Sequence, residues 1–162
     1  MFSTFDEIRS AGFEGFVTIA ALKANPHLPP DRMGVYLVLA PDRYAAEFLP
    51  KGSGGHYRRN PNRPMDVIKT HWVNGAIVLN IGKAGKIVGD VTLRGRLRAY
   101  MRFGSGENVS HYGGRHIWQL ANSDDLLICW KATEEEPREV ERRLIAAFKA
   151  HYGVRPFANL QD

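Results

Sequence analysis

Three short apolar runs limit what this chain can fold into more than any other feature does. The runs are GVYLVLA at residues 34–40, AIVLNI at 76–81 and DDLLICWK at 124–131. Each is rich in branched aliphatic residues and shorter than a typical buried helix, so each predicts a β-strand. A long segment separates the first two runs, and we expect these two strands to pair as an antiparallel ribbon.

Two later segments have the periodicity of amphipathic helices. Apolar side chains recur at helical spacing over residues 92–103 and 134–152. The second segment also carries a start and a stop signal. Thr133 and Glu136 have the spacing of a capping box, and Gly153 follows the last apolar residue. These patterns predict two helices with one buried face each.

The organisation predicted from these elements is a single domain over residues 1–162. Helix-like spacing in residues 3–25 predicts an N-terminal helical extension over residues 1–30. The core spans residues 34–160 and contains an insertion at 41–73, where Gly, Pro and Asn cluster and apolar residues are few. The predicted fold class is α+β, a small three-stranded antiparallel sheet flanked by helices.

Composition excludes several classes of protein. Apolar residues make up 44% of the chain and charged residues 24%, which is typical of a globular domain and excludes wholesale disorder. The single cysteine, Cys129, excludes a disulfide framework. No apolar run approaches the ~18 residues of a membrane span, and the acidic start lacks the pattern of a signal peptide. We therefore expect a cytoplasmic protein that does not partner a membrane.

The positive charge of the chain is concentrated in its middle third. Residues 51–102 hold eleven basic and two acidic side chains, whereas the segments before and after carry a net charge of −2 each. Such asymmetry favours a polyanionic partner, of which nucleic acid is the commonest. The alternative is a solvated basic face with no partner.

Two charged residues fall on or near the apolar faces of the predicted helices. Glu141 lies in line with Ile145, and a carboxylate there loses hydration, so it needs an arginine or a divalent metal nearby. Arg96 lies between Leu93 and Tyr100, where its guanidinium could hold a phosphate through two parallel hydrogen bonds. Alternatively, Glu141 and Arg96 form a structural ion pair and have no further role.

Two other motifs do not predict the sites that they suggest at first. GKAGK at residues 82–86 lacks the leading glycine and the closing Ser or Thr of a P-loop. His111, His116 and Cys129 do not have the spacing of a structural zinc site. We interpret the two histidines as phosphate contacts or structural hydrogen-bond donors.

The motifs of the chain, taken in order, resemble those of the GIY-YIG endonuclease family. They are GVY at residues 34–36, LNIGKA at 79–84, LRGRLRAY at 93–100, ERRLI at 141–145, and Asn159 after Pro156 and Phe157. The resemblance covers residues 34–160. It implies a GIY-YIG-like fold and a metal-dependent endonuclease that hydrolyses DNA phosphodiester bonds.

The resemblance also implies a role for each matching residue. Tyr36 would be the general base or would position the attacking water, and Lys83 would hold the phosphate region and lower the pKa of the phenol. Arg96 would neutralise the charge that develops on the phosphoryl oxygens. Tyr100 would orient the nucleophile or the leaving group.

At the remaining matching positions, the resemblance implies that Glu141 binds a divalent ion, Mg²⁺ or Mn²⁺, and that Asn159 fixes neighbouring groups. Asn80 stands where the family has its second tyrosine, and an amide can hydrogen-bond but cannot transfer a proton. The expected partner is DNA, most simply double-stranded. The residues expected to contact it are Arg58, Arg59, Arg63, Lys86, Arg94, Arg98, Arg102, His111 and His116. Two other functions remain open: a catalytically impaired nucleic-acid-binding domain, and a small interaction or regulatory domain.

Overall fold

A four-stranded antiparallel sheet forms the centre of the protein in the computed structural model, which describes residues 2–86 and 91–161. The strand order is β1-β4-β2-β3. The strands are β1 (Glu14–Thr18), β2 (Gly34–Leu39), β3 (Val78–Ala84) and β4 (Leu127–Ala132). The α-helices are α1 (Phe5–Ser10), α2 (Ile19–Ala24), α3 (Met65–Thr70), α4 (Leu93–Gly104) and α5 (Pro137–Tyr152), with 3₁₀ turns η1 (Arg115–Gln119) and η2 (Ser123–Asp125). The α+β class predicted from the sequence is confirmed.

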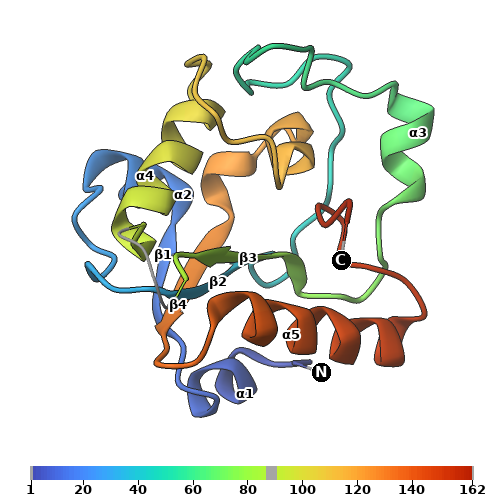
Figure 1. The fold of residues 1–162 in the computed structure, drawn as a ribbon. Coiled ribbons are helices and arrows are strands. Elements are labelled where there is room, and N and C mark those ends of the chain that lie inside the picture. The colour runs from blue at the N-terminus through green and yellow to red at the C-terminus, as the bar shows by residue number, and fades with distance from the viewer. Residues whose placement is uncertain (1, 87–90, 162) are drawn as a thin grey trace.

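Helices cover both faces of the sheet. Helices α1 and α5 pack on one face, and α2, α4 and η1 pack on the other (Figure 1). All six residues of β2 are buried, and they alternate between the two layers as a strand requires. Tyr36 and Val38 belong to the core under α4, whereas Val35, Leu37 and Leu39 belong to the core over α5.

The N-terminal segment corrects two predictions, the helical extension and the three-stranded sheet. Residues 3–25 form α1, β1 and α2, and β1 pairs with β4 as a fourth, edge strand. The physical reason lies in the backbone. Gly12 follows α1 with a φ of +88°, which ends a helix, and Gly15, with a φ of +98°, lies in β1 at a shift of register against β4. Gly15 is also pressed against an aromatic ring, since a Cβ there would lie 2.7 Å from Trp130. Helix-like apolar spacing therefore concealed a strand.

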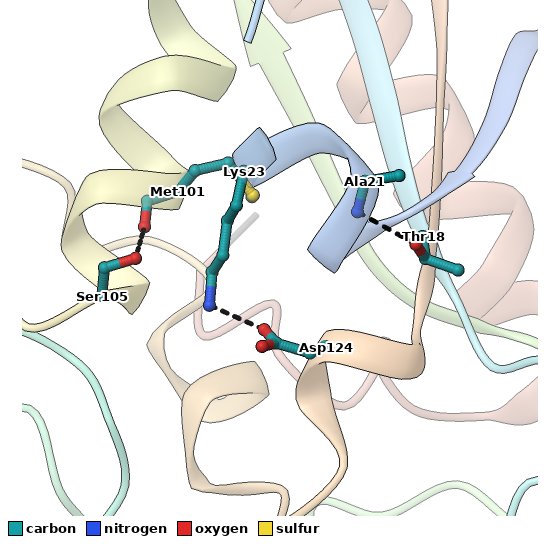
Figure 2. Close-up of polar contacts among 6 residues, drawn as sticks. All are labelled: Thr18, Ala21, Lys23, Met101, Ser105 and Asp124. Atoms are coloured by element: carbon teal, nitrogen blue, oxygen red, sulfur yellow. Dashed lines mark hydrogen bonds and ion pairs between the residues drawn. The ribbon is translucent and has the colours of Figure 1, made fainter. Parts of the chain in front are cut away.

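Helix α2 is fixed at both of its ends (Figure 2). At its start, the Thr18 hydroxyl accepts a hydrogen bond from the backbone N–H of Ala21 at 3.1 Å, which is an N-cap. Near its end, Lys23 Nζ donates to Asp124 Oδ1 at 2.6 Å. This ion pair joins α2 to η2.

The three predicted strands are confirmed, with shifted ends. The second run begins as a strand only at Val78 and continues to Ala84, which brings Lys83 into the sheet. The third begins at Leu127, because Ser123–Asp125 form η2. The first two strands do pair in antiparallel fashion, and β4 inserts on the other side of β2.

Both predicted helices are confirmed, but the start of α5 differs from the prediction. The capping box is absent, since Glu136 is itself the N-cap residue and its side chain makes no capping hydrogen bond. The Thr133 hydroxyl instead accepts a hydrogen bond from the N–H of Glu135 at 3.0 Å. Gly153 ends the helix in the left-handed conformation, with φ of +76°. No helix within the described residues is long and apolar enough to cross a membrane.

The insertion at residues 41–73 packs against η1. The buried side chain of Gln119 connects the two segments through hydrogen bonds. Its Nε2 donates to the carbonyls of Leu49 and Arg63 at 3.0 and 2.9 Å. Its Oε1 accepts from the N–H of Arg63 at 2.7 Å. These bonds fix the insertion as an ordered wall beside the sheet.

Candidate functional site

A cleft of about 490 Å³ opens beside strand β3. Residues from seven separate segments of the chain meet in its lining. The predicted catalytic residues among them are Tyr36 on β2, Asn80 and Lys83 on β3, Arg96 on α4, Glu141 on α5, and Asn159 in the C-terminal segment. Positions spread over residues 36–159 are thus brought together by the fold.

Tyr36 enters the cleft because the residue opposite it has no side chain. In the β2–β3 pair Tyr36 faces Gly82. A Cβ at Gly82 would lie 2.2 Å from the ring carbon that bears the hydroxyl and 2.4 Å from the hydroxyl oxygen itself. The phenol therefore lies directly over the backbone of β3, with its hydroxyl toward the edge of the sheet.

The Tyr36 hydroxyl is buried, and burial keeps it protonated. Burial raises the pKa of Tyr36 above its ordinary value of 10.0, and the charge and hydrogen bond of Arg96 offset part of this rise. The nearby Glu141 carboxylate raises the pKa further. At neutral pH the phenol is therefore a hydrogen-bond donor.

Glu141 is half-buried on α5 and lies among positive charges. Burial raises the pKa of its carboxyl, while Lys83, Arg96 and Arg138 lower it. Among the described residues no cation forms an ion pair with Glu141 within 4.0 Å. The alternative that Glu141 and Arg96 form a direct structural ion pair is therefore not supported, and the carboxylate is open to another cation.

Asn159 uses its side chain to extend the sheet. Its Oδ1 accepts from the N–H of Ile81, and its Nδ2 donates to the carbonyl of Ile81, both at 2.8 Å. The N–H of Ala158 also donates to the carbonyl of Leu79 at 2.8 Å. Asn159 thus fixes β3 at the residue between Asn80 and Gly82, and it acts on the site as a positioning residue.

Tyr100 and His111 lie behind the cleft and do not line it. Tyr100 is fully buried, donates to the carbonyl of Gly114 at 2.8 Å, and stacks on His111 with ring centres 4.4 Å apart. Its ring also lies 6.1 Å from that of Tyr36. Tyr100 therefore supports Tyr36 through packing.

The two histidines correct the prediction that they contact DNA. His111 is 1% exposed and His116 is 0% exposed, so neither reaches the surface. Burial lowers the pKa of His111 to about 2 and that of His116 to about 4, so both are neutral. His116 lies beside the carbonyl of Phe157 at 3.2 Å, in keeping with the alternative of a structural donor.

The other residues predicted to contact DNA divide into two groups. Arg59 and Arg63 line the cleft. The remaining ones do not, and two of them are held elsewhere: Arg94 Nε donates to the carbonyl of Pro29 at 3.0 Å, and Arg102 pairs with Glu107 at 2.7 Å. Arg58, Lys86 and Arg98 are exposed outside the cleft.

Of the lining residues that sequence reasoning missed, Tyr112 is the aromatic one and Arg115 the charged one. The guanidinium carbons of Arg59 and Arg115 lie 4.0 and 4.3 Å from the centre of the Tyr112 ring. Both missed residues come from the segment HYGGRH, in a part of the chain with a net negative charge. The sequence signal that could have identified them is a tyrosine and an arginine on either side of two glycines.

The balance of charge in the cleft is strongly positive. Lys83, Arg59, Arg63, Arg96 and Arg115 line it together with Glu141, the one acidic residue in its described lining. Within the described residues, no three His, Cys, Asp or Glu side chains are close enough together to hold a metal ion among themselves. The arrangement suits a ligand with several negative charges.

Comparison of the chain with protein-family models, with curated proteins and with solved structures gives no match in any of the three.

Proposed function

We propose that this protein is a metal-dependent endonuclease that hydrolyses phosphodiester bonds of DNA, as its resemblance to GIY-YIG endonucleases implies. The observation that carries the proposal is the meeting of Tyr36, Lys83, Arg96 and Glu141 in one positive cleft. Phosphodiester hydrolysis requires an oriented water, neutralisation of the phosphoryl charge and a stabilised leaving oxygen. The cleft offers groups suited to the first two tasks.

The polar side chains have separable roles in this proposal. Lys83 and Arg96 bind the phosphate and offset the charge that develops on its oxygens. Tyr36 keeps its proton near neutral pH, since burial raises its pKa. In this proposal Tyr36 orients the attacking water through a hydrogen bond. The general-base role that the resemblance also implies would require a bound cation to lower the pKa of the phenol.

Glu141 fits the role of metal ligand. Mg²⁺ is commonly held by one or two carboxylates, with the substrate phosphate and waters completing its shell. Glu141 supplies one half-buried carboxylate in the cleft, and it has no close ion-pair partner among the described residues. When bound there, Mg²⁺ or Mn²⁺ would polarise the phosphate and lower the pKa of a bound water.

Asn80 favours a second candidate function, a domain that binds nucleic acid without cutting it. Asn80 is 3% exposed, lines the cleft, and has no proton to transfer near neutral pH. Loss of a proton-transfer group slows catalysis without removing the cations that bind the backbone. DNA binding is common to both candidates, and cleavage separates them.

The test is nicking of supercoiled plasmid with and without Mg²⁺. We expect Mg²⁺-dependent nicking by the natural protein and none by Glu141→Gln, with DNA affinity nearly unchanged in the variant. The substitution removes the charge while keeping the shape, so the fold is retained. Glu139→Gln is the matched control, since Glu139 lies on the same helix, exposed and paired with Arg142. Cleavage by Glu141→Gln at the natural rate would contradict the proposal, and absence of nicking with retained binding would favour the second candidate.

A further inference from the structure

A cluster of three arginines and a tyrosine forms one wall of the cleft. The ring of Tyr112 lies against the guanidinium groups of Arg59 and Arg115, at 4.0 and 4.3 Å. Arg63 completes the lining on this side. The ring is itself fixed, since its hydroxyl donates to the carbonyl of Asn60 at 2.5 Å. Cation–π contacts of this kind hold guanidinium groups in place without neutralising them.

The charges of this cluster have no acidic partner in the part of the chain that the structure describes. Among the described residues no carboxylate lies within 4.0 Å of Arg59, Arg63 or Arg115. The Nε of Arg115 is buried and has no hydrogen-bond partner there. Burial lowers the pKa of Arg115, Tyr112 offsets part of this effect, and the charges of Arg63 and Arg59 lower the pKa further. Like charges held together in this way repel one another, and a bound anion would remove that repulsion.

The backbone that carries the cluster is fixed before any ligand binds. Gln119 bonds the N–H and the carbonyl of Arg63, at 2.7 and 2.9 Å. Asn62 accepts from the N–H of Gly52 at 2.7 Å and donates to Asn60 at 2.8 Å. A preformed set of donors binds an anion with little loss of conformational entropy.

We propose that Arg59, Arg63 and Arg115 bind a second phosphate of the nucleic-acid strand whose scissile phosphate lies at Lys83 and Arg96. This inference rests on the proposed function, because it takes the phosphate at Lys83 and Arg96 to be the scissile one and places the next phosphate of the same strand at the arginine cluster. Guanidinium forks match phosphate oxygens in pairs, and the buried Nε of Arg115 gains the acceptor that it lacks. Tyr112 is the positioning residue of this second site.

The experiment compares two nucleotides that differ by one phosphate. Thymidine 3′,5′-bisphosphate and thymidine 5′-monophosphate are titrated into the full chain in EDTA, by calorimetry, so that neither metal nor cleavage contributes. We expect the bisphosphate to bind at least about ten-fold more tightly than the monophosphate, the order of one charge-assisted hydrogen bond. Arg115→Gln should remove most of this advantage and leave monophosphate binding nearly unchanged.

Two further sets of variants make the test specific. Arg43→Gln removes the same charge from the insertion at a 93% exposed side chain outside the cleft, and it should keep the full bisphosphate advantage. Tyr112→Leu should reduce the advantage although it changes no charge. If Arg115→Gln fails to fold, Arg59→Gln and Arg63→Gln provide the same test, since both side chains are exposed.

The outcomes separate this inference from the nuclease proposal. An equal affinity for both nucleotides, or an advantage that survives the arginine substitutions, would overturn the second phosphate site even if the protein cuts DNA. A bisphosphate advantage that depends on Arg115 would support the site even if plasmid is never nicked. An equal loss in Arg43→Gln would show that net charge alone is responsible, and the site would be rejected.

Discussion

Gly82 faces Tyr36 across the β2–β3 pair, and a methyl group at this position would lie 2.2 Å from the phenol ring. The ring cannot move aside freely, because it also packs against Tyr100, with ring centres 6.1 Å apart. The place of the Tyr36 hydroxyl in the cleft therefore depends on the absence of a side chain two positions beyond Asn80. The small size of Gly82, and not a charge, determines where the Tyr36 hydroxyl lies.

Gly82→Ala should displace the Tyr36 ring and reduce cleavage by about 10²-fold, the loss expected for a misplacement of about 1 Å. The overpacked sheet should also lose about 1–3 kcal/mol of unfolding free energy, measured by urea denaturation. Gly95→Ala is the matched control, since a Cβ there meets only Thr92 Oγ1 at 3.6 Å. In a Tyr36→Leu background most of the stability cost of Gly82→Ala should disappear. A cost that stays the same would show that the clash lies elsewhere.

Other residues of the cleft show what sequence reasoning could predict at this scale. Glu141 stood out because a carboxylate fell near an apolar helix face, and the structure has it half-buried beside Lys83 and Arg96. The role of Asn159 could not be derived in the same way. Its two hydrogen bonds to Ile81 join positions 78 residues apart, and no local pattern encodes such a contact.

At the scale of elements, periodicity predicted α4, α5 and three strands, and it failed in the N-terminal segment. Apolar residues there recur at helical spacing, but the positive φ angle of Gly12 separates α1 from β1. The neighbours that stabilise β1 lie on β4, more than 100 residues later. A short edge strand is determined by such distant pairing more than by its own pattern.

The insertion is the element whose charges can be tested directly. Arg59 and Arg63 line the cleft, whereas Arg58 is exposed outside it with its guanidinium 5.0 Å from the centre of the Tyr57 ring. Neutralising Arg59 and Arg63 together should lower the slope of log affinity for DNA against log salt by about two, roughly one for each lost phosphate contact. Arg58→Gln should lower the slope by less than Arg59→Gln or Arg63→Gln does alone. Fluorescence anisotropy with duplex DNA at several salt concentrations measures this, and an unchanged slope in the double variant would exclude the insertion from DNA binding.

For the whole molecule, the sequence predicted the sign of the charge and the part of the chain that supplies most of the basic residues of the candidate site. It did not predict which distant residue completes them. The middle third of the chain supplies Arg59, Arg63, Lys83 and Arg96, as its net charge suggested. Arg115 comes from the acidic last third and joins them only because Tyr112 and the insertion fold against each other. Charge counted along a sequence cannot reveal a cluster assembled in three dimensions.

The two buried histidines make the stability of the whole molecule depend on pH. In the unfolded chain both take up protons near pH 6.5. In the folded protein the pKa of His111 is about 2, through burial and the charge of Arg96. That of His116 is about 4, where burial and the charges of His71, Arg115 and Arg63 outweigh the hydrogen bond to Phe157.

Between pH 6.5 and pH 4 the unfolded state therefore binds more protons, and the protein loses stability as the pH falls. The loss should reach about 1.4 kcal/mol per pH unit for each histidine. Urea denaturation between pH 7 and pH 5, above the range in which ordinary carboxylates are protonated, measures this slope. His111→Phe should keep the aromatic stack on Tyr100 and remove about half of the slope that the two buried histidines cause. His71, whose pKa is also lowered by burial, adds its own part to the slope in both proteins. A variant with the slope of the natural protein would show that His111 is protonated in the fold and that its ring is not sealed from water.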